Sequence, residues 1–171
     1  MPKNQDGKLT IGGYDLKYAK KGSSEEDITW SSVSNDEKTW SANFNGLKFK
    51  DGANIATKSE KIMLDTGLTY ALVPSADVES VAKALMGYTI KCEAPSYTGH
   101  LGLYTCECSQ ESYGSLKPIQ LFIGGQYFDM PVESYIERHS SEEGPECKLL
   151  LHPYDTSYGS DSKWVLGAQF L

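Results

Sequence analysis

The strongest candidate for chemistry in this sequence is Asp65, which follows Ile62-Met63-Leu64 and precedes Thr66 and Gly67. The apolar run predicts a buried strand, and a carboxylate at the end of such a strand is costly unless it is hydrogen-bonded or used in a reaction. Gly67 permits a tight turn that brings its N–H close to the carboxylate, and the Thr66 hydroxyl can bind neighbouring backbone. As a bare tripeptide, Asp-Thr-Gly is more typical of an ordinary turn after a strand, so its context has to decide.

Other reaction types have weaker support. His100, His139 and His152 lie in separate segments without the paired spacing of metal ligands, so we expect each to be exposed or locally bonded. The sequence has no Gly-x-Ser-x-Gly elbow, and the doublets Gly12-Gly13 and Gly124-Gly125 are better explained as turns than as phosphate loops. We therefore expect no metal and no cofactor.

The context of Asp65 resembles the second, C-terminal lobe of pepsin and cathepsin D-like aspartic proteases. Further landmarks of that lobe occur in family order across essentially the whole chain. They are Leu9-Thr10-Ile11-Gly12-Gly13-Tyr14-Asp15, Ile28-Thr29-Trp30, Trp40, Met63 to Pro74, Cys108, Leu116-Lys117-Pro118-Ile119, Phe122-Ile123-Gly124-Gly125, Tyr135-Ile136, Cys147 and Trp164-Val165-Leu166-Gly167. The resemblance implies a mainly β fold with small helices, in which residues 1–171 form this lobe. The N-terminal lobe and the last strands of the family are expected to be absent.

The resemblance also implies an aspartic endopeptidase, in which Asp65 and an aspartate of the N-terminal lobe hold a water molecule that attacks the peptide bond. The partners would be that lobe and a peptide or protein substrate, and this chain alone would be inactive. The residues implied to support the catalytic loop are Thr66, Gly67, Leu68, Leu166 and Gly167. The residues implied to line substrate pockets are Met63, Leu68 and Val165, all apolar, which suggests hydrophobic substrate side chains.

Two positions depart from the family pattern. Leu68 stands where the family usually has Ser or Thr, whose hydroxyl bonds the catalytic carboxylate, and Ala168 stands where Asp is common. Losing one charge-assisted hydrogen bond costs about 1.5 to 3 kcal/mol of carboxylate stabilisation. These departures motivate an alternative function, a non-catalytic binding or structural module that retains the protease fold.

Periodicity predicts the elements that would position the site. Alternation of polar and apolar residues predicts short antiparallel strands at 8–11, 28–31 and 39–44. Asn45-Gly46 and Gly124-Gly125 are predicted hairpin turns, because these residues accept a positive φ. Apolar residues at helical spacing predict a helix from Asp77, as its cap, to Leu85, and a shorter one from Pro131 to Arg138.

Composition and net charge limit the classes of partner that this chain is expected to bind. The chain has 171 residues, enough for one domain, with 23 acidic and 16 basic side chains and a net charge of −7. Nucleic acid is an unlikely partner for such a balance, because phosphate binding needs clustered Lys and Arg. No apolar run approaches the roughly 20 residues that span a bilayer, and residues 1–6 lack the apolar core of a signal peptide.

The four cysteines, Cys92, Cys106, Cys108 and Cys147, lack the paired spacing of a zinc site. Their even number predicts two disulfides in an oxidising compartment, with four buried free thiols as the alternative. The resemblance implies a bridge between Cys108 and Cys147, and with it a second between Cys92 and Cys106. It also implies a secreted, lysosomal or vacuolar location.

Overall fold

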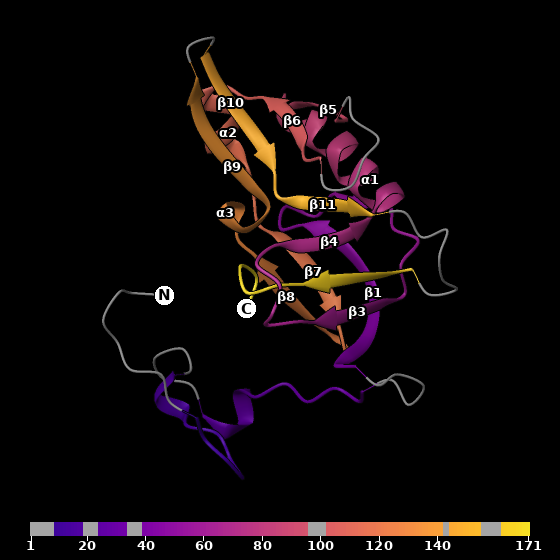
Figure 1. Ribbon diagram of the computed structural model, residues 1–171, viewed down its shortest axis with the longest axis vertical. Coiled ribbons are helices and arrows are strands. Elements are labelled where there is room, and N and C mark those ends of the chain that lie inside the picture. Colours follow the sequence, from indigo (N-terminus) through magenta and orange to yellow (C-terminus); the bar gives the residue numbers. More distant parts are fainter. Residues whose placement is uncertain (1–8, 19–23, 34–38, 96–101, 142–143, 155–161) are drawn as a thin grey trace. The chain divides into compact units, whose positions relative to one another are not determined.

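A computed structural model describes residues 9–18, 24–33, 39–95, 102–141, 144–154 and 162–171 of the protein (Figure 1). The chain divides into two units, residues 1–30 and 31–171. The first contains two short 3-10 helices, η1 (Leu16–Tyr18) and η2 (Glu25–Asp27), and an edge-on contact between the rings of Tyr14 and Trp30 at 6.4 Å. The strands predicted at 8–11 and 28–31 are wrong for their described residues, because alternation without a partner strand does not form a sheet.

The second unit carries two sheets (Figure 1). Its strands are β1 (Ser41–Phe49), β2 (Asn54–Ile55), β3 (Lys61–Leu64), β4 (Ala71–Pro74), β5 (Lys91–Glu93), β6 (Tyr104–Glu107), β7 (Ile119–Ile123), β8 (Gln126–Met130), β9 (Ile136–Ser141), β10 (Gly144–Leu149), β11 (Leu151–Tyr154) and β12 (Lys163–Leu166). Within the described residues, the larger sheet has the order β11-β4-β12-β3-β1-β7-β8, with β2 beside β1. The smaller sheet has the order β5-β6-β10-β9. A mainly β architecture is therefore confirmed.

The centre of the larger sheet mixes strand directions. Strand β12 runs parallel to β3, with Leu166 opposite Leu64, and antiparallel to β4, where Val165 faces Leu72. On the other side of β4, β11 runs parallel, with His152 opposite Leu72. This arrangement brings the end of β3 and the end of β12 together, and the segments that follow both strands meet there.

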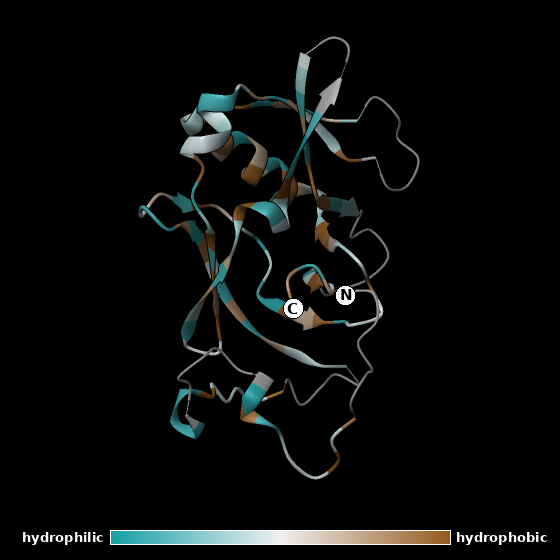
Figure 2. Ribbon diagram, turned by 90° about the vertical axis from the view of Figure 1, so that its left-hand side faces the viewer, coloured by the Kyte–Doolittle hydropathy of each residue, from teal (hydrophilic) through white to brown (hydrophobic). Residues whose placement is uncertain are grey.

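Helix α1 (Ser75–Leu85) covers the junction of the two sheets, where it packs against β4, β5 and β11. It begins two residues before the predicted start, directly after Pro74, and its fully buried face includes Val78, Val81 and Leu85. Figure 2 shows hydrophilic and hydrophobic stretches alternating along the helices and strands, as expected for elements that bury one face.

The remaining helices are short: α2 (Gln110–Ser115), α3 (Val132–Tyr135) and the 3-10 helix η3 (Met86–Tyr88). Of the helix predicted from Pro131 to Arg138, only the first half forms, as α3. The chain passes into β9 at Ile136, which is fully buried and lies opposite Leu149 of β10. Tertiary pairing with a neighbouring strand here overrides the helical spacing.

The two predicted hairpin turns have different outcomes. Gly124 and Gly125, with φ of 57° and 91°, form the turn between β7 and β8, so this prediction is confirmed. Asn45-Gly46 lies inside β1, where the register to β7 shifts between Phe44 and Leu47. Gly46 has a φ of 128°, so the conformational freedom that predicts a turn serves an irregularity within one strand instead.

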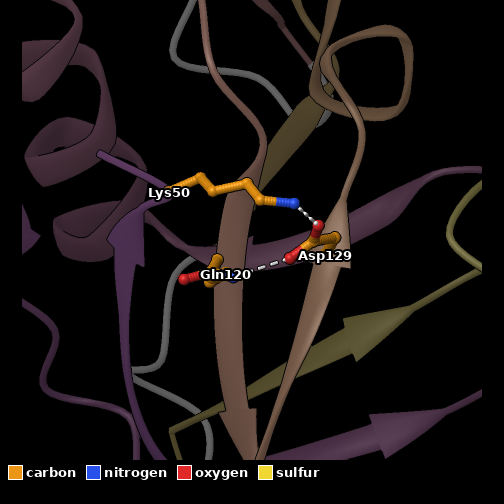
Figure 3. A network of polar contacts seen from close by, with 3 residues as sticks. All are labelled: Lys50, Gln120 and Asp129. Atoms are coloured by element: carbon orange, nitrogen blue, oxygen red, sulfur yellow. Dashed lines mark hydrogen bonds and ion pairs between the residues drawn. The ribbon is translucent and has the colours of Figure 1, made fainter. Parts of the chain in front are cut away.

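A polar network ties three strands together at the surface (Figure 3). The Lys50 ammonium, just after β1, donates to Asp129 Oδ2 of β8 at 2.7 Å, and Gln120 Nε2 of β7 donates to Asp129 Oδ1 at 2.8 Å. These two contacts hold the pKa of Asp129 below its ordinary value. An ion pair as exposed as this one contributes at most about 1 kcal/mol to stability.

Two disulfides secure the smaller sheet, so the alternative of four free thiols is wrong. Cys108 is joined to Cys147 and Cys92 to Cys106, the pairs that the resemblance implies. The Cys108–Cys147 bridge spans 39 residues, and a loop of that length gives about 3 to 4 kcal/mol in the chain-entropy model. The second bridge joins directly opposite residues of β5 and β6.

Candidate active site

Asp65 begins a tight turn at the point where β3 ends. Its N–H donates to the carbonyl of Leu166, the last residue of β12, at 2.9 Å, and its own carbonyl accepts from the Leu68 N–H at 3.2 Å. The backbone of Asp65 is thus fixed on one side by β12 and on the other by its own turn. This places the half-buried carboxyl group at the ends of two neighbouring parallel strands.

The Gly67 N–H donates to Asp65 Oδ1 at 2.9 Å. This bond orients the carboxyl group, as the sequence predicts for this glycine. The Thr66 hydroxyl has no hydrogen-bond partner within the described part of the chain, so the expectation that it fixes the loop is not met. Leu68 at the next position is half-buried and offers its backbone but no side-chain donor.

Backbone hydrogen bonds join the segment after β12 to the Asp65 loop. The Ala168 N–H donates to the Leu68 carbonyl at 2.7 Å and the Gln169 N–H donates to the Thr69 carbonyl at 3.0 Å. Gly167, the residue before Ala168, lies so close to the loop that a Cβ atom there would overlap the carbonyl oxygens of Tyr70 and Leu68, the latter at 2.5 Å. Only glycine allows this approach without moving the loop.

Replacing Gly167 by alanine is therefore expected to push the two segments apart. Overpacking against rigid backbone destabilises by about 1 to 3 kcal/mol or more, and chemical denaturation of the 171-residue chain would measure this loss. Gly87→Ala is the matched control, because a Cβ there meets nothing within 4 Å. Equal midpoints for the two variants would contradict the close approach.

The predicted pocket residues lie around the same strand ends. Met63 of β3 and Val165 of β12 are directly paired and both half-buried, and the backbone of Leu68 is bonded to Asp65 and Ala168, in the segments that follow these two strands. Leu166, named as a support of the catalytic loop, is fully buried and receives the Asp65 N–H. The structure thus gathers the residues from both segments into one place.

Exposed apolar side chains lie near the Asp65 turn. The Trp40 carbonyl accepts from the Leu64 N–H at 3.0 Å, and the two residues are 76% and 40% exposed. Tyr70, at the far end of the loop, is 41% exposed. Large apolar groups gathered around one carboxylate are typical of a surface that another protein surface covers.

Sequence reasoning missed the role of Asp77. Instead of capping α1 at the surface, its carboxylate is 1% exposed and accepts four hydrogen bonds from the approach to β3 and from β12. The donors are Thr57 Oγ1 (2.6 Å), Lys58 N (2.8 Å), Ser59 Oγ (2.6 Å) and Trp164 Nε1 (3.0 Å). Burial alone would raise the pKa of this carboxyl group, but the four hydrogen bonds outweigh burial and lower the pKa.

The described residues show no cluster of three or more His, Cys, Asp or Glu side chains that could hold a metal ion. In the same part of the chain, no helix is long and apolar enough to cross a membrane. Among the described residues, the site brings together the Asp65 carboxyl group, the backbone of Gly67 and Gly167, and apolar neighbours.

Comparisons with known proteins relate the chain to a known family. A family model described as eukaryotic aspartyl protease matches residues 1–171. The sequence is 24% identical to napsin-A of Mus musculus over 77% of this chain and 29% of that protein, and 22% identical to cathepsin D of Gallus gallus over 96% and 37%. The chain thus spans about a third of the length of these relatives.

A solved structure of an aspartic proteinase from Irpex lacteus has the same fold. The match covers 82% of this chain and 40% of that chain, with a TM-score of 0.56 and 19% sequence identity. Such a level of identity supports the fold alone. The activity of this chain has to be argued from its own residues.

Proposed function

The chain belongs to the eukaryotic aspartyl protease family, and from this premise we propose that it is one lobe of a two-lobed aspartic endopeptidase, with Asp65 as one of two catalytic aspartates. One observation carries the proposal. A carboxylate oriented by the Gly67 amide lies at the joined ends of β3 and β12, in a chain that matches the family model throughout its length.

In the proposed mechanism, Asp65 and an aspartate from an N-terminal lobe hold one water molecule between them. Two carboxyl groups a few ångströms apart cannot both ionise cheaply, so the pair shares a proton and divides into a base and an acid. The ionised member accepts a proton as the water attacks the scissile carbonyl, and the protonated member polarises that carbonyl. Because the two groups titrate as a pair, neither role is assigned to Asp65 by itself.

The proposed partner of the Asp65 surface is this second lobe. Covering Trp40, Leu64 and Tyr70 would remove large apolar side chains from water and would bring the second carboxyl group to the first. A lobe without that partner has half of the catalytic pair, so the isolated 171-residue chain is proposed to be inactive.

The proposed substrates are peptides with hydrophobic side chains next to the cleaved bond, which Met63, Leu68 and Val165 would contact. The two disulfides favour an oxidising compartment, and we propose a secreted, lysosomal or vacuolar location. A cleavage profile dominated by charged residues at the scissile bond would contradict the proposed specificity.

The second candidate function is a non-catalytic binding or structural module with the same fold. Leu68 and Ala168 favour it, because neither offers a side-chain hydrogen bond to the site. The two functions are separated by assaying the full-length protein at acidic pH on a peptide library, with and without a pepstatin-type inhibitor. Inhibitable cleavage supports the protease; inhibitor binding and cleavage both absent would support the module.

Leu68→Thr is a direct test of this departure. A hydroxyl at position 68 can donate to the Asp65 carboxylate, and a charge-assisted bond of about 1.5 kcal/mol would raise kcat/KM of the full-length protease about tenfold. Leu68→Val is the matched control, because valine has the shape of threonine without its hydroxyl. If both variants change activity equally, the effect comes from side-chain size and the missing hydroxyl is not what limits the enzyme.

A further inference from the structure

His152 is a half-buried residue whose two ring nitrogen atoms are buried without a hydrogen-bond partner among the described residues. It lies in β11 opposite Leu72 of β4. A neutral imidazole carries one donor and one acceptor, and buried polar atoms in native proteins are almost always paired. An orphaned ring of this kind costs stability and calls for an explanation.

The ring does have one close neighbour, Tyr70. The two ring centroids are 5.0 Å apart with an interplanar angle of 33°. Tyr70 closes the loop that begins at Asp65, and its carbonyl is one of the two oxygens against which Gly167 packs. The imidazole of His152 therefore contacts the end of the Asp65 loop through the ring of Tyr70.

Among the described residues, no charge is a cause of the His152 pKa shift that would offset burial. Burial lowers the pKa of the imidazole, and it is the sole cause of the shift. The other ionisable groups on the neighbouring elements are engaged elsewhere. In α1, Asp77 is held by its four donors and Glu79 pairs with Lys83 at 2.6 Å; in β11, the Tyr154 hydroxyl donates to the Lys163 carbonyl.

We propose that His152 is a positioning residue for the Asp65 loop, which it supports through Tyr70 while its ring is neutral and releases when the ring is protonated. The inference rests on the proposed function only for the catalytic role of Asp65. The contact between His152 and Tyr70, and its response to protonation, can be measured in this chain alone. A charged imidazolium has two donors and needs water or an acceptor, so protonation draws the ring out of its contact with Tyr70. The Asp65 loop is then tighter near neutral pH and looser in acid.

The direction of the pH dependence follows from the lowered pKa. The unfolded chain takes up the His152 proton near pH 6.5, whereas the folded chain takes it up at lower pH. Between the two values the unfolded state binds more protons, so stability falls as pH decreases through this window. Above pH 6.5 the contribution of the neutral ring is fully present.

The test is a titration of the 171-residue chain by NMR, with thermal unfolding followed from pH 7.5 to 4.5. The wild-type His152 ring is expected to titrate below 6.5, and the Tyr70 ring signals are expected to move with the same midpoint. His152→Phe keeps an aromatic ring that cannot be charged, so its melting temperature loses the wild-type step in this pH range. Tyr70→Phe is the matched control, because it keeps the ring contact and removes only the hydroxyl.

A His152 that titrates at 6.5 or above, or Tyr70 signals that stay constant, would overturn the proposal. So would a His152→Phe variant whose melting temperature falls with pH as the wild type does. These readouts need no catalysis, so they stand apart from failure of the protease assay. In an active full-length protease, His152→Phe is expected to shift the acid limb of the kcat profile to lower pH with KM unchanged, which a merely structural role would not do.

Discussion

Asp65→Asn is expected to lower kcat of the proposed two-lobed protease by about 10³-fold or more, with little change in KM. Asparagine has the shape of aspartate and its carbonyl oxygen can still accept the Gly67 N–H, so the turn after β3 is retained. It cannot take or give the proton that the attacking water exchanges, and positioned acid and base groups contribute about 10² to 10⁴ in rate. The measurement is steady-state cleavage of a peptide substrate at acidic pH.

The matched control is Asp129→Asn, a carboxylate changed in the same way on β8, the edge strand of the larger sheet. Its contacts with Lys50 and Gln120 are shown in Figure 3. This variant loses an exposed ion pair with Lys50, so it is expected to retain kcat and to lose at most about 1 kcal/mol of stability. Unfolding curves of Asp65→Asn that match the wild type would show that the loss of rate comes from chemistry. A fully active Asp65→Asn variant would rule out the two-aspartate mechanism.

Much of the fold and of the Asp65 turn is predictable from sequence because their signals are local. The apolar run before Asp65, the glycine two residues after it and the glycine pair between β7 and β8 each act within a few residues. Gly46 shows the limit of such signals. Its positive φ is predictable, but whether it ends a strand or lies within one depends on the pairing of β1 with β7.

The supporting groups of the site are not predictable in this way, because their partners are distant in sequence. Asp77 lies 87 residues from Trp164, and the spacing of α1 alone favours a helix cap. His152 meets Tyr70 only because β11 pairs with β4. In both cases the environment of an ionisable group is set by strand pairing, which a single sequence does not reveal.

The largest loss of stability is expected from Asp77→Asn. The amide keeps one acceptor oxygen but turns an NH₂ group toward donors that now have no acceptor, and each buried unpaired group costs about 1 to 3 kcal/mol. The expected total is about 3 kcal/mol or more, measured by urea unfolding of the 171-residue chain at pH 7. Glu79→Gln on the same helix is the control, since it removes only a solvent-exposed pair with Lys83 and is expected to leave stability nearly unchanged.

The effect of Asp77 on stability has its own pH window. The folded-state pKa of Asp77 is lowered from 3.8, so its contribution is fully present above pH 3.8 and is lost as pH falls through the folded value. The difference between wild type and Asp77→Asn should therefore shrink only below pH 3.8, whereas the contribution of His152 begins to fall already below pH 6.5. A difference that shrinks already between pH 7 and 5 would mean that the carboxylate is not held ionised by its four donors. If the Asp77 window holds, β3 and β12 stay joined beneath Asp65 at the acidic pH where the proposed reaction runs, and only the loop above them responds to His152.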